Sequence, residues 1–321
     1  MKRGATMAAL WLSAAMLGGC GVQELMLGTE NDYLLLAIDS LAAPNQETML
    51  HVQVRGGDFL RGQSGLAVRF FRDGRLFKVA ETGEDGAAAV TFTPSAPGDY
   101  EFVAQVAPAG LSQSPPEPAT LLVACRQPDA PLVLVDLDKT VVASGFEAVL
   151  LGTPKPMDHS RRVLGRLAER RTIVYLTHRP ELLGPKSKRW LADNSFPRGP
   201  LLSSTVSGFL KGSGAYKAGR IAELKKTFTN LEIGIGDKIS DARAYLDNGM
   251  RAIMILDIPP AGARNRRARL KDLAEELKSL RDDEKAQVVI GWDQVEKAIF
   301  EGAAYPPSAM QKHLLDMAKG E

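Results

Sequence analysis

The feature that most constrains the fold of this chain is a change in its hydrophobic pattern near residue 130. Before that point, short apolar segments rich in Val and Phe are separated by turn residues such as Asp73-Gly74 and Pro97-Gly98. After it, apolar strand-like runs alternate with longer amphipathic segments. Strands joined by short turns form antiparallel sheets, whereas strands that alternate with helices form parallel sheets. The pattern therefore predicts an all-β domain followed by an α/β domain.

The expected all-β domain covers residues 31–126. Apolar and polar residues alternate most clearly in His51–Val54 and Tyr100–Val103, and the turn spacing is typical of a small antiparallel sandwich. The corner Pro97–Tyr100 resembles that of immunoglobulin-like modules on bacterial surface proteins. This segment gathers no nucleophile, base and metal ligand, so we interpret it as a spacer or docking domain. Two prolines in Arg126–Pro131 mark its end.

Residues 1–19 have the pattern of a secretory signal peptide. A basic start precedes an apolar run, residues 5–17, that is too short to span a bilayer comfortably. The segment ends at Cys20 in the sequence Leu-Gly-Gly-Cys, which resembles the lipobox of bacterial lipoproteins. The resemblance implies that Cys20 is lipidated, that residues 20–30 tether the protein to a membrane and that the protein is a cell-envelope lipoprotein. Because Gly21 is not the aspartate of inner-membrane lipoproteins, we expect an outer-membrane location facing the periplasm.

The charge balance points to no charged macromolecule as partner. Lys and Arg number 40 against 38 for Asp and Glu, so no global field attracts nucleic acid and none is expected as a partner. Cys125 is the one cysteine besides Cys20, and we expect it to be a buried apolar residue. The sequence leaves the oligomeric state open.

Residues 127–321 have the pattern of a parallel sheet with helical crossover connections. We expect strands at Leu132–Val135, Thr172–Leu176, Leu231–Ile235 and Arg251–Leu256. We expect helices at Ser160–Arg170, Glu181–Asp193, Tyr216–Phe228 and Ser240–Asn248, with Gly249 closing the last. The predicted fold class is therefore α/β, with a Rossmann-type parallel sheet and flanking helices behind the small all-β sandwich.

Two carboxylates, Asp136 and Asp138, come directly after the first of these strands. Ligands of an open parallel sheet bind beyond the carboxyl ends of its strands, so both acids emerge where chemistry is expected. Alternate residues of an extended chain share one side, and two like charges so close together require a cation. A hard divalent metal with oxygen ligands satisfies that requirement.

The segment from Asp136 to Thr140 resembles the first motif, Asp-x-Asp-x-Thr, of the haloacid dehalogenase superfamily. This resemblance implies that Asp136 is the nucleophile that forms an aspartyl-phosphate. It implies that Asp138 protonates the leaving oxygen, then activates water, and lends its backbone carbonyl to the metal. Lys139 departs from the family pattern, in which a glycine is frequent at this position.

Three further segments follow in the order of that superfamily's motifs. By the resemblance, Thr177 binds phosphoryl oxygens. Nearby, Arg179 either reaches the substrate phosphate or forms a surface salt bridge. Lys217 neutralises the phosphate and the nucleophile; Lys211 competes for this role, but Lys217 stands at the head of an amphipathic helix.

The last of the three segments, Gly234 to Asp241, supplies two more acids. The resemblance implies that Asp237 joins Asp136 and Asp138 as a ligand of Mg²⁺, and that Asp241 is a further ligand or holds a metal-bound water. Without the metal, three or four carboxylates would face one lysine. We therefore expect the metal-free site to bind phosphate poorly.

The intervals between the motifs leave no room for a large cap domain, so a capless site open to bulky substrates is predicted. Within the superfamily, residues 131–256 resemble the phosphatase-like domain of lipins and large phosphatidylinositol-transfer proteins. The resemblance rests on Tyr175–Pro180, on residues 190–200 and on Gly234–Tyr245. It implies a magnesium-dependent phosphomonoester hydrolase acting on a lipid phosphate such as phosphatidate.

Two alternatives remain open at this point. One is a lipoprotein acid phosphatase acting on nucleotides or other small phosphomonoesters. The other is a non-catalytic lipid-binding or envelope scaffold module in which the sandwich does the work. The basic segments Lys186–Arg189 and Arg264–Lys271 are either docking sites for anionic headgroups or solvated helix faces.

Overall fold

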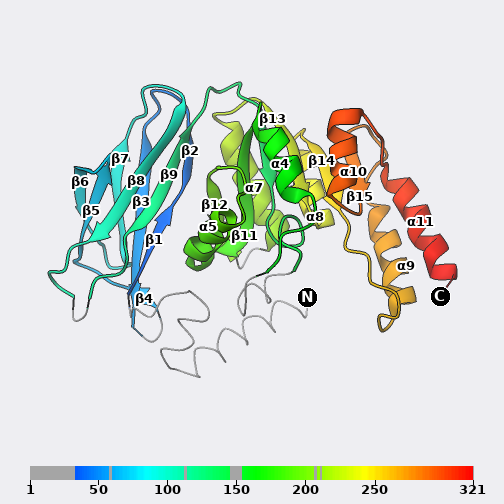
Figure 1. Ribbon diagram of the computed structural model, residues 1–321, viewed down its shortest axis with the longest axis horizontal. Helices are drawn as coiled ribbons and strands as arrows, with labels where there is room; N and C mark the ends of the chain where they lie inside the picture. The colour runs from blue at the N-terminus through cyan, green and yellow to red at the C-terminus, as the bar shows by residue number, and fades with distance from the viewer. Residues whose placement is uncertain are drawn as a thin grey trace. The chain divides into compact units, whose positions relative to one another are not determined.

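The computed structural model describes residues 33–57, 60–111, 114–144, 154–205, 208–209 and 212–320. These residues form two compact units (Figure 1). The first comprises the described residues up to Arg126 together with Pro180–Trp190, and the second comprises the remainder. The expected signal peptide, Cys20 and the tether lie outside the described residues. Within the described part, no helix is long and apolar enough to cross a membrane.

The first unit is built on two β-sheets. In one sheet, β3 (Thr48–Gly56) pairs antiparallel with β1 (Tyr33–Ile38), β4 (Arg61–Gly62) and β7 (Ala87–Phe92). The other has the order β2 (Ser40–Ala42), β9 (Ala119–Cys125), β8 (Gly98–Val106), β5 (Ala67–Arg72) and β6 (Arg75–Glu81). Only β2, which pairs parallel with β9, departs from the antiparallel pattern among the described pairs of this sheet. The predicted small all-β sandwich is confirmed.

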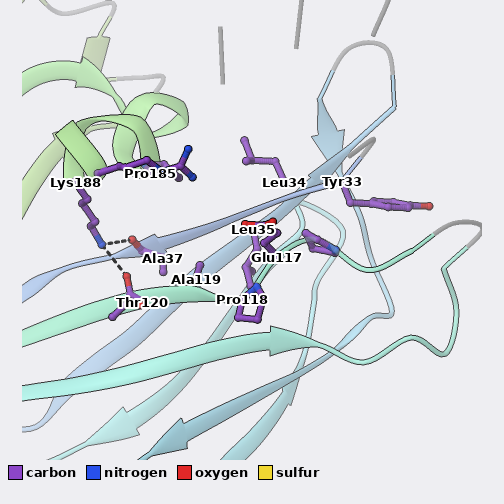
Figure 2. A pocket seen from close by; sticks show the side chains of 12 residues that line it. Tyr33, Leu34, Leu35, Ala37, Glu117, Pro118, Ala119, Thr120, Pro185 and Lys188 are labelled. Carbon is purple, nitrogen blue, oxygen red and sulfur yellow. Dashed lines mark hydrogen bonds between the residues drawn. The ribbon is translucent and has the colours of Figure 1, made fainter. Parts of the chain in front are cut away.

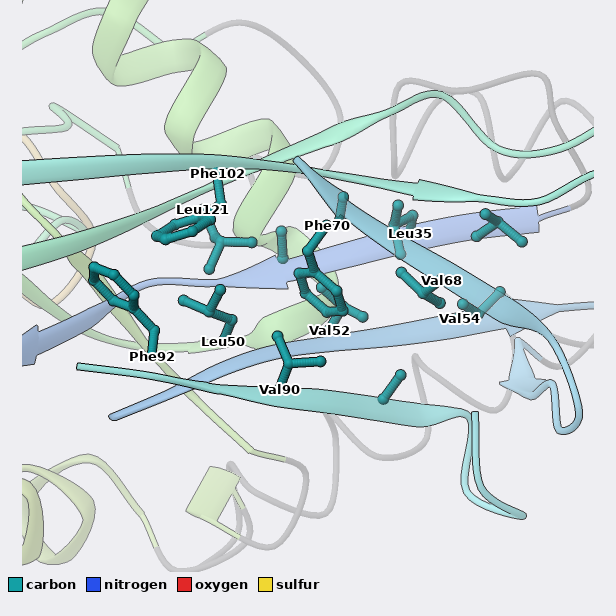
Figure 3. Close-up of a cluster of buried hydrophobic side chains, with 14 of the residues drawn as sticks. Leu35, Leu50, Val52, Val54, Val68, Phe70, Val90, Phe92, Phe102 and Leu121 are labelled. Carbon is teal, nitrogen blue, oxygen red and sulfur yellow. The ribbon is translucent and has the colours of Figure 1, made fainter. Parts of the chain in front are cut away.

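Apolar side chains of both sheets fill the interior of the sandwich (Figure 3). Val52 from one sheet and Phe70 and Phe102 from the other are fully buried. Buried and less buried positions alternate along β3, as a two-residue period requires. Cys125 is fully buried, as predicted. Each large apolar side chain removed from water contributes about 1.5–3 kcal/mol, so this core holds the sheets together.

A segment distant in sequence completes the first unit. It comprises η1 (Glu181–Leu183) and most of α5 (Gly184–Asp193). The Lys188 ammonium donates hydrogen bonds to the carbonyls of Ala37 and Thr120 at 2.8 and 3.0 Å (Figure 2). It also donates a hydrogen bond to the Asp39 carboxylate at 2.5 Å. The Asp39 side chain is 4% exposed, so its charge depends on this partner.

Asp39 stands where the chain leaves β1 for β2 and thereby changes sheets. Its carboxylate also accepts a hydrogen bond from the Leu122 backbone N–H at 2.8 Å. A pocket of about 240 Å³ opens beside the contact and is lined by residues of β1, α5 and the segment leading into β9 (Figure 2). Lys188 therefore serves the fold and is not available to lipid headgroups in this arrangement.

The second unit contains a six-stranded sheet. Its order is β12 (Leu201–Ser204), β11 (Thr172–Pro180), β10 (Leu132–Val135), β13 (Leu231–Gly236), β14 (Arg251–Ile255) and β15 (Ala286–Val289). The pairs β10–β11, β10–β13, β13–β14 and β14–β15 are parallel. The predicted parallel sheet is therefore confirmed. The sequence patterns did not predict β12 as a strand.

The helices of the second unit are α4 (Ser160–Ala168), α7 (Ser213–Lys225), α8 (Ile239–Asp247), α9 (Arg266–Leu277), α10 (Trp292–Glu296), η2 (Lys297–Glu301) and α11 (Pro307–Lys319). Gly249, predicted to close α8, has φ +79° and donates its N–H to the Leu246 carbonyl at 2.8 Å. Residues 145–153, between β10 and α4, lie outside the description, so the absence of a cap stays a prediction.

The strand order places a topological switch point between β10 and β13. The chain passes from β10 through β11 to β12 on one side, and then returns to β13 on the other. The connections therefore diverge at the carboxyl ends of these two neighbouring strands. Ligands of open α/β sheets bind in the crevice that such a divergence leaves.

Removing the Lys188 ammonium tests its contribution to the first unit. We expect Lys188→Met to lower the free energy of unfolding by about 3 kcal/mol, because the buried Asp39 charge loses its cation. The double variant Asp39→Asn/Lys188→Met should recover part of this loss. Urea denaturation measures both, with the exposed neighbour Arg189→Met as control. Equal stability of the Lys188→Met and Arg189→Met variants would contradict the prediction.

Candidate active site

Three carboxylates meet at the switch point of the parallel sheet. Asp136 follows β10, Asp237 follows β13 and Asp241 lies in the first turn of α8. The Asp136 backbone N–H donates to the Ile235 carbonyl at 2.9 Å, which continues the pairing of β10 with β13 beyond the strand ends. One oxygen from each carboxylate lies within 4.8 Å of the other two. The site is thus made by the ends of two neighbouring strands and the helix that follows.

The donor set fits a hard divalent cation. All three side chains offer carboxylate oxygens, which Mg²⁺ prefers. The Asp237 Oδ1 atom is buried and has no hydrogen-bond partner in the described part of the chain. The Lys238 ammonium lies 3.9 Å from this oxygen, beyond hydrogen-bond distance. A buried carboxylate oxygen without a partner is costly, and a metal ion would supply what is missing.

Lys217, on α7, is the cation at the centre of the site. Its side chain is fully buried, and its Nζ atom lies 2.8 Å from Asp136 Oδ2 and 2.6 Å from Asp241 Oδ2. Burial alone lowers the pKa of Lys217, but the charges of Asp136 and Asp241 outweigh it and hold the pKa well above its ordinary value. Lys211, the other candidate for this position, lies outside the described residues.

The three carboxylates differ in their tendency to ionise. Burial raises the pKa of Asp136, but Lys217 and Lys238 outweigh it, so the net shift is downward. Burial and then the Asp136 charge raise the pKa of Asp237 to about 7. Burial also raises the pKa of Asp241, against the opposing charge of Lys217. The metal-free site therefore resists full ionisation, and a divalent cation would offset the excess negative charge.

Small residues let these acids approach one another. A Cβ atom at Gly236 would lie 3.1 Å from Asp241 Oδ2, so a side chain there would press on the carboxylate. A Cβ atom at Gly234 would lie 2.1 Å from the Tyr245 ring, which packs fully buried against the strand. The Tyr245 hydroxyl donates to the Ile235 carbonyl at 3.4 Å. The Gly-Ile-Gly pattern of β13 thus allows α8 to pack closely against the strand.

Asp138 does not join the other acids. Its carboxylate accepts two hydrogen bonds from the Arg179 guanidinium, Nε to Oδ2 at 3.0 Å and Nη2 to Oδ1 at 2.7 Å. The Arg179 side chain is 2% exposed and that of Asp138 is 16% exposed. The expectation that Asp138 binds the metal rested on its backbone carbonyl, and its side chain is engaged elsewhere.

The remaining predicted residues lie around this centre. Thr177 is fully buried near the end of β11, and its hydroxyl oxygen accepts a hydrogen bond from the Arg179 N–H at 3.2 Å. Thr140 is also buried, with its hydroxyl unpartnered among the described residues and its carbonyl accepting from Trp292 Nε1 at 2.6 Å. His178 stacks on Phe209, with ring centroids 4.9 Å apart. The side chains of Thr140 and Thr177 are therefore both buried, and the Thr177 hydroxyl oxygen is paired with the backbone of its own segment.

Lys139 adopts a backbone conformation that is more common for glycine. Its φ is +53°, in the left-handed region that residues with a Cβ atom rarely adopt. Its ammonium forms an ion pair with Asp257 at 2.6 Å. Asp257 belongs to the segment after β14, so this ion pair connects the loop after β10 with the loop after β14.

Three residues of the site were missed by sequence reasoning. The Ser213 hydroxyl donates to Asp241 Oδ1 at 3.1 Å, and the Lys238 charge acts on the pKa of all three acids. Trp292 holds the Thr140 carbonyl from a distant part of the chain. The position of Lys238 between Asp237 and Asp241 was a usable signal, whereas nothing near Trp292 or Ser213 indicated a contact with the site.

No protein-family model and no curated protein matches this sequence. Solved structures similar to it cover about its N-terminal third. A fibronectin(III)-like module of Clostridium thermocellum CbhA is 11% identical over 29% of this chain and 98% of that one, with a TM-score of 0.21. The CARDB domain of Pyrococcus furiosus PF1109 is 24% identical over 29% and 94%, with a TM-score of 0.22. The Ig1-2 module of a Drosophila receptor protein tyrosine phosphatase, DLAR, is 9% identical over 33% and 61%, with a TM-score of 0.24.

The variant Asp237→Asn tests two properties of the acidic cluster, its destabilising effect on the metal-free fold and its capacity to bind Mg²⁺. Because the pKa of Asp237 is raised from 3.8 to about 7, its ionisation destabilises the metal-free fold above that pH, and the cost fades as the pH falls toward 3.8. We expect Asp237→Asn to stabilise the metal-free protein at about pH 8 by at least the ~1.4 kcal/mol of one pKa unit, and by less at about pH 5.

The same variant should lose stabilisation by Mg²⁺, since one ligand is gone. Chemical denaturation with and without Mg²⁺ measures both effects. Asp247→Asn, at an exposed position of the same helix, is the matched control. If Mg²⁺ stabilised the Asp237→Asn variant as much as it stabilises the unaltered protein, Asp237 would not be a ligand of the metal.

Proposed function

We propose that this protein is a magnesium-dependent phosphomonoester hydrolase of haloacid dehalogenase type. The observation that carries the proposal is the meeting of Asp136, Asp237, Asp241 and Lys217 at the switch point of the parallel sheet. A nucleophilic carboxylate, further acids suited to a divalent cation and a buried ammonium together form a site for a phosphoryl group. Magnesium held by the three carboxylates and the Asp138 backbone carbonyl would offset the negative charge of that group.

The chain's own residues account for both halves of the reaction. An Asp136 oxygen attacks phosphorus, the bond from phosphorus to the ester oxygen breaks, and that oxygen takes a proton from the Asp138 carboxyl group. In the second half, Asp138 takes a proton from water as the water oxygen attacks phosphorus and releases Asp136. Lys217 balances the charge of the nucleophile and of the phosphoryl oxygens, which Thr177 also binds. Ester and water become alcohol and inorganic phosphate.

A lipid phosphate such as phosphatidate is the substrate class we propose. Four exposed basic residues cluster at the start of α9 and make no ion pair with any other described residue: Arg264, Arg267, Arg269 and Lys271. Helices that follow parallel strands begin on the carboxyl side of the sheet, so this cluster lies on the same side as the three carboxylates. Its charges suit an anionic membrane surface.

The basic residues at the start of α9 interact unfavourably with the helix dipole. Their placement therefore does not stabilise the helix, which favours another role for them. The first turn contains no acidic residue, whereas Glu275 and Glu276 lie near the carboxyl end. Basic groups at a helix N-terminus cost about 0.3–1 kcal/mol each. An anionic bilayer would offset this cost, and a lipid on Cys20 would hold the enzyme at such a surface, which we propose is the periplasmic face of the outer membrane.

Phosphate release from lipid and soluble esters tests the proposed function. We expect turnover of phosphatidate vesicles that requires Mg²⁺, and a loss of at least ~10³-fold in Asp136→Asn, which lacks the nucleophile. Asp247→Asn should retain full activity. Higher efficiency on nucleotides than on phosphatidate would favour a soluble-ester phosphatase, and no turnover by the unaltered protein would favour a non-catalytic module.

Reversal of two charges tests the membrane surface separately. We expect Arg264→Glu/Arg267→Glu to weaken binding to phosphatidylglycerol vesicles by about 30-fold, since each basic residue at such a surface contributes about 1 kcal/mol. Hydrolysis of a soluble ester should not change. Lys225→Glu/Lys226→Glu, at the far end of α7, is the matched control. Equal vesicle binding by the two double variants would contradict the proposed surface.

A further inference from the structure

The Asp138–Arg179 pair forms a second ion-pair system beside the three-carboxylate site. The two residues come from the ends of neighbouring parallel strands, Asp138 from the loop after β10 and Arg179 from the end of β11. Both nitrogens of the guanidinium edge contact both oxygens of the carboxylate, at 3.0 and 2.7 Å. Such a planar fork fixes the carboxylate in orientation as well as in position.

The burial of Arg179 limits what else it can do. With 2% of its side chain exposed and Asp138 occupying its fork, the guanidinium presents little surface to an incoming phosphate. Its backbone N–H donates to the Thr177 hydroxyl oxygen at 3.2 Å, which ties it to the same loop. Lys217 meanwhile pairs with Asp136 and Asp241. Arg179 therefore neutralises Asp138, whereas Lys217 offsets charge in the three-carboxylate site.

We propose that Arg179 is a positioning residue that acts through Asp138, holding the Asp138 carboxyl group for proton transfer, and that it is not a direct ligand of the substrate phosphate. This inference rests on the proposed hydrolase function. It replaces both roles that the sequence left open for Arg179, contact with the substrate phosphate and a surface salt bridge. Because Asp138 would serve as proton donor and then as acceptor, its place relative to the ester oxygen matters in both halves of the reaction.

The two possible roles of Arg179 differ in their dependence on the leaving group. An alkoxide leaves poorly without a proton, whereas para-nitrophenolate leaves readily without one. A misplaced Asp138 should therefore slow alkyl ester hydrolysis much more than aryl ester hydrolysis. A lost phosphate ligand would instead weaken binding of both esters and of inorganic phosphate, since the phosphoryl group is the same in each.

The experiment compares Arg179→Met, Arg179→Lys, Asp138→Asn and the double variant Asp138→Asn/Arg179→Met on glycerol phosphate and para-nitrophenyl phosphate with Mg²⁺. We expect Arg179→Met to lower kcat about a hundredfold on the alkyl ester and less than about tenfold on the aryl ester. KM and inhibition by inorganic phosphate should stay unchanged. The double variant should be no slower than Asp138→Asn, and Arg179→Lys should recover part of the loss.

Arg171→Met is the matched control. Arg171 forms the same kind of fork with Glu232, at 2.8 and 2.9 Å, at the opposite ends of β11 and β13. Its loss removes a fork of the same geometry at a more exposed position, with 23% of the Arg171 side chain exposed, so Arg171→Met should leave the ratio of alkyl to aryl turnover unchanged. A similar change of that ratio in both variants would show a general structural effect and would overturn the proposal.

Two further results would overturn it. One is an equal loss on both esters accompanied by a rise of more than about tenfold in KM and in the inhibition constant of phosphate, because a direct ligand acts in that way. The other is a slower double variant than Asp138→Asn. If Arg179→Met fails to fold, Arg179→Lys allows the same comparison, with a smaller expected loss on the alkyl ester. Absence of turnover of phosphatidate vesicles and of both soluble esters by the unaltered protein identifies failure of the hydrolase proposal itself.

Discussion

The contact on which the candidate site depends is the buried ammonium of Lys217 between Asp136 and Asp241. A fully buried lysine is stable only when its charge is matched, and here two carboxylates match it at 2.8 and 2.6 Å. The pairing ties α7 to the end of β10 and to the first turn of α8. It also leaves Asp237 as the acid with a buried oxygen unpartnered among the described residues. The three carboxylates thus neutralise the buried Lys217 charge and provide oxygens that could bind a divalent cation.

The sequence predicted the two-part architecture because periodicity is a local property. The four strands expected after residue 127 and the glycine that closes α8 correspond to β10, β11, β13, β14 and Gly249. Asp136 and Asp138 could be named because they directly follow a strand, and parallel strands present their carboxyl ends at one edge. Asp237 and Asp241 were named through the resemblance of their segment to a known motif. The short segment Leu201–Ser204 was not identified as β12, since only two of its four residues are apolar, whereas Leu132–Val135 is apolar throughout.

Contacts between distant segments could not be predicted in the same way. The pairing of Arg179 with Asp138 depends on which side of β10 the strand β11 occupies, and nothing in the residues near Arg179 indicates a carboxylate partner. The ion pair of Lys188 with Asp39 links positions far apart in the chain. In the sequence, Lys188 belongs to a basic run that is typical of a solvated helix face. Burial, which no local pattern records, decides both roles.

The place of Pro180–Trp190 within the first unit bears on how such a chain can arise or be divided. A domain made of one continuous stretch can be shuffled between genes by a single cut at each end. This sandwich takes the counter-ion of Asp39 from a helix encoded after the first two strands of the parallel sheet. A cut after Arg126 would separate the Asp39 carboxylate from that counter-ion, so the sandwich could not be moved in this way with the contact intact.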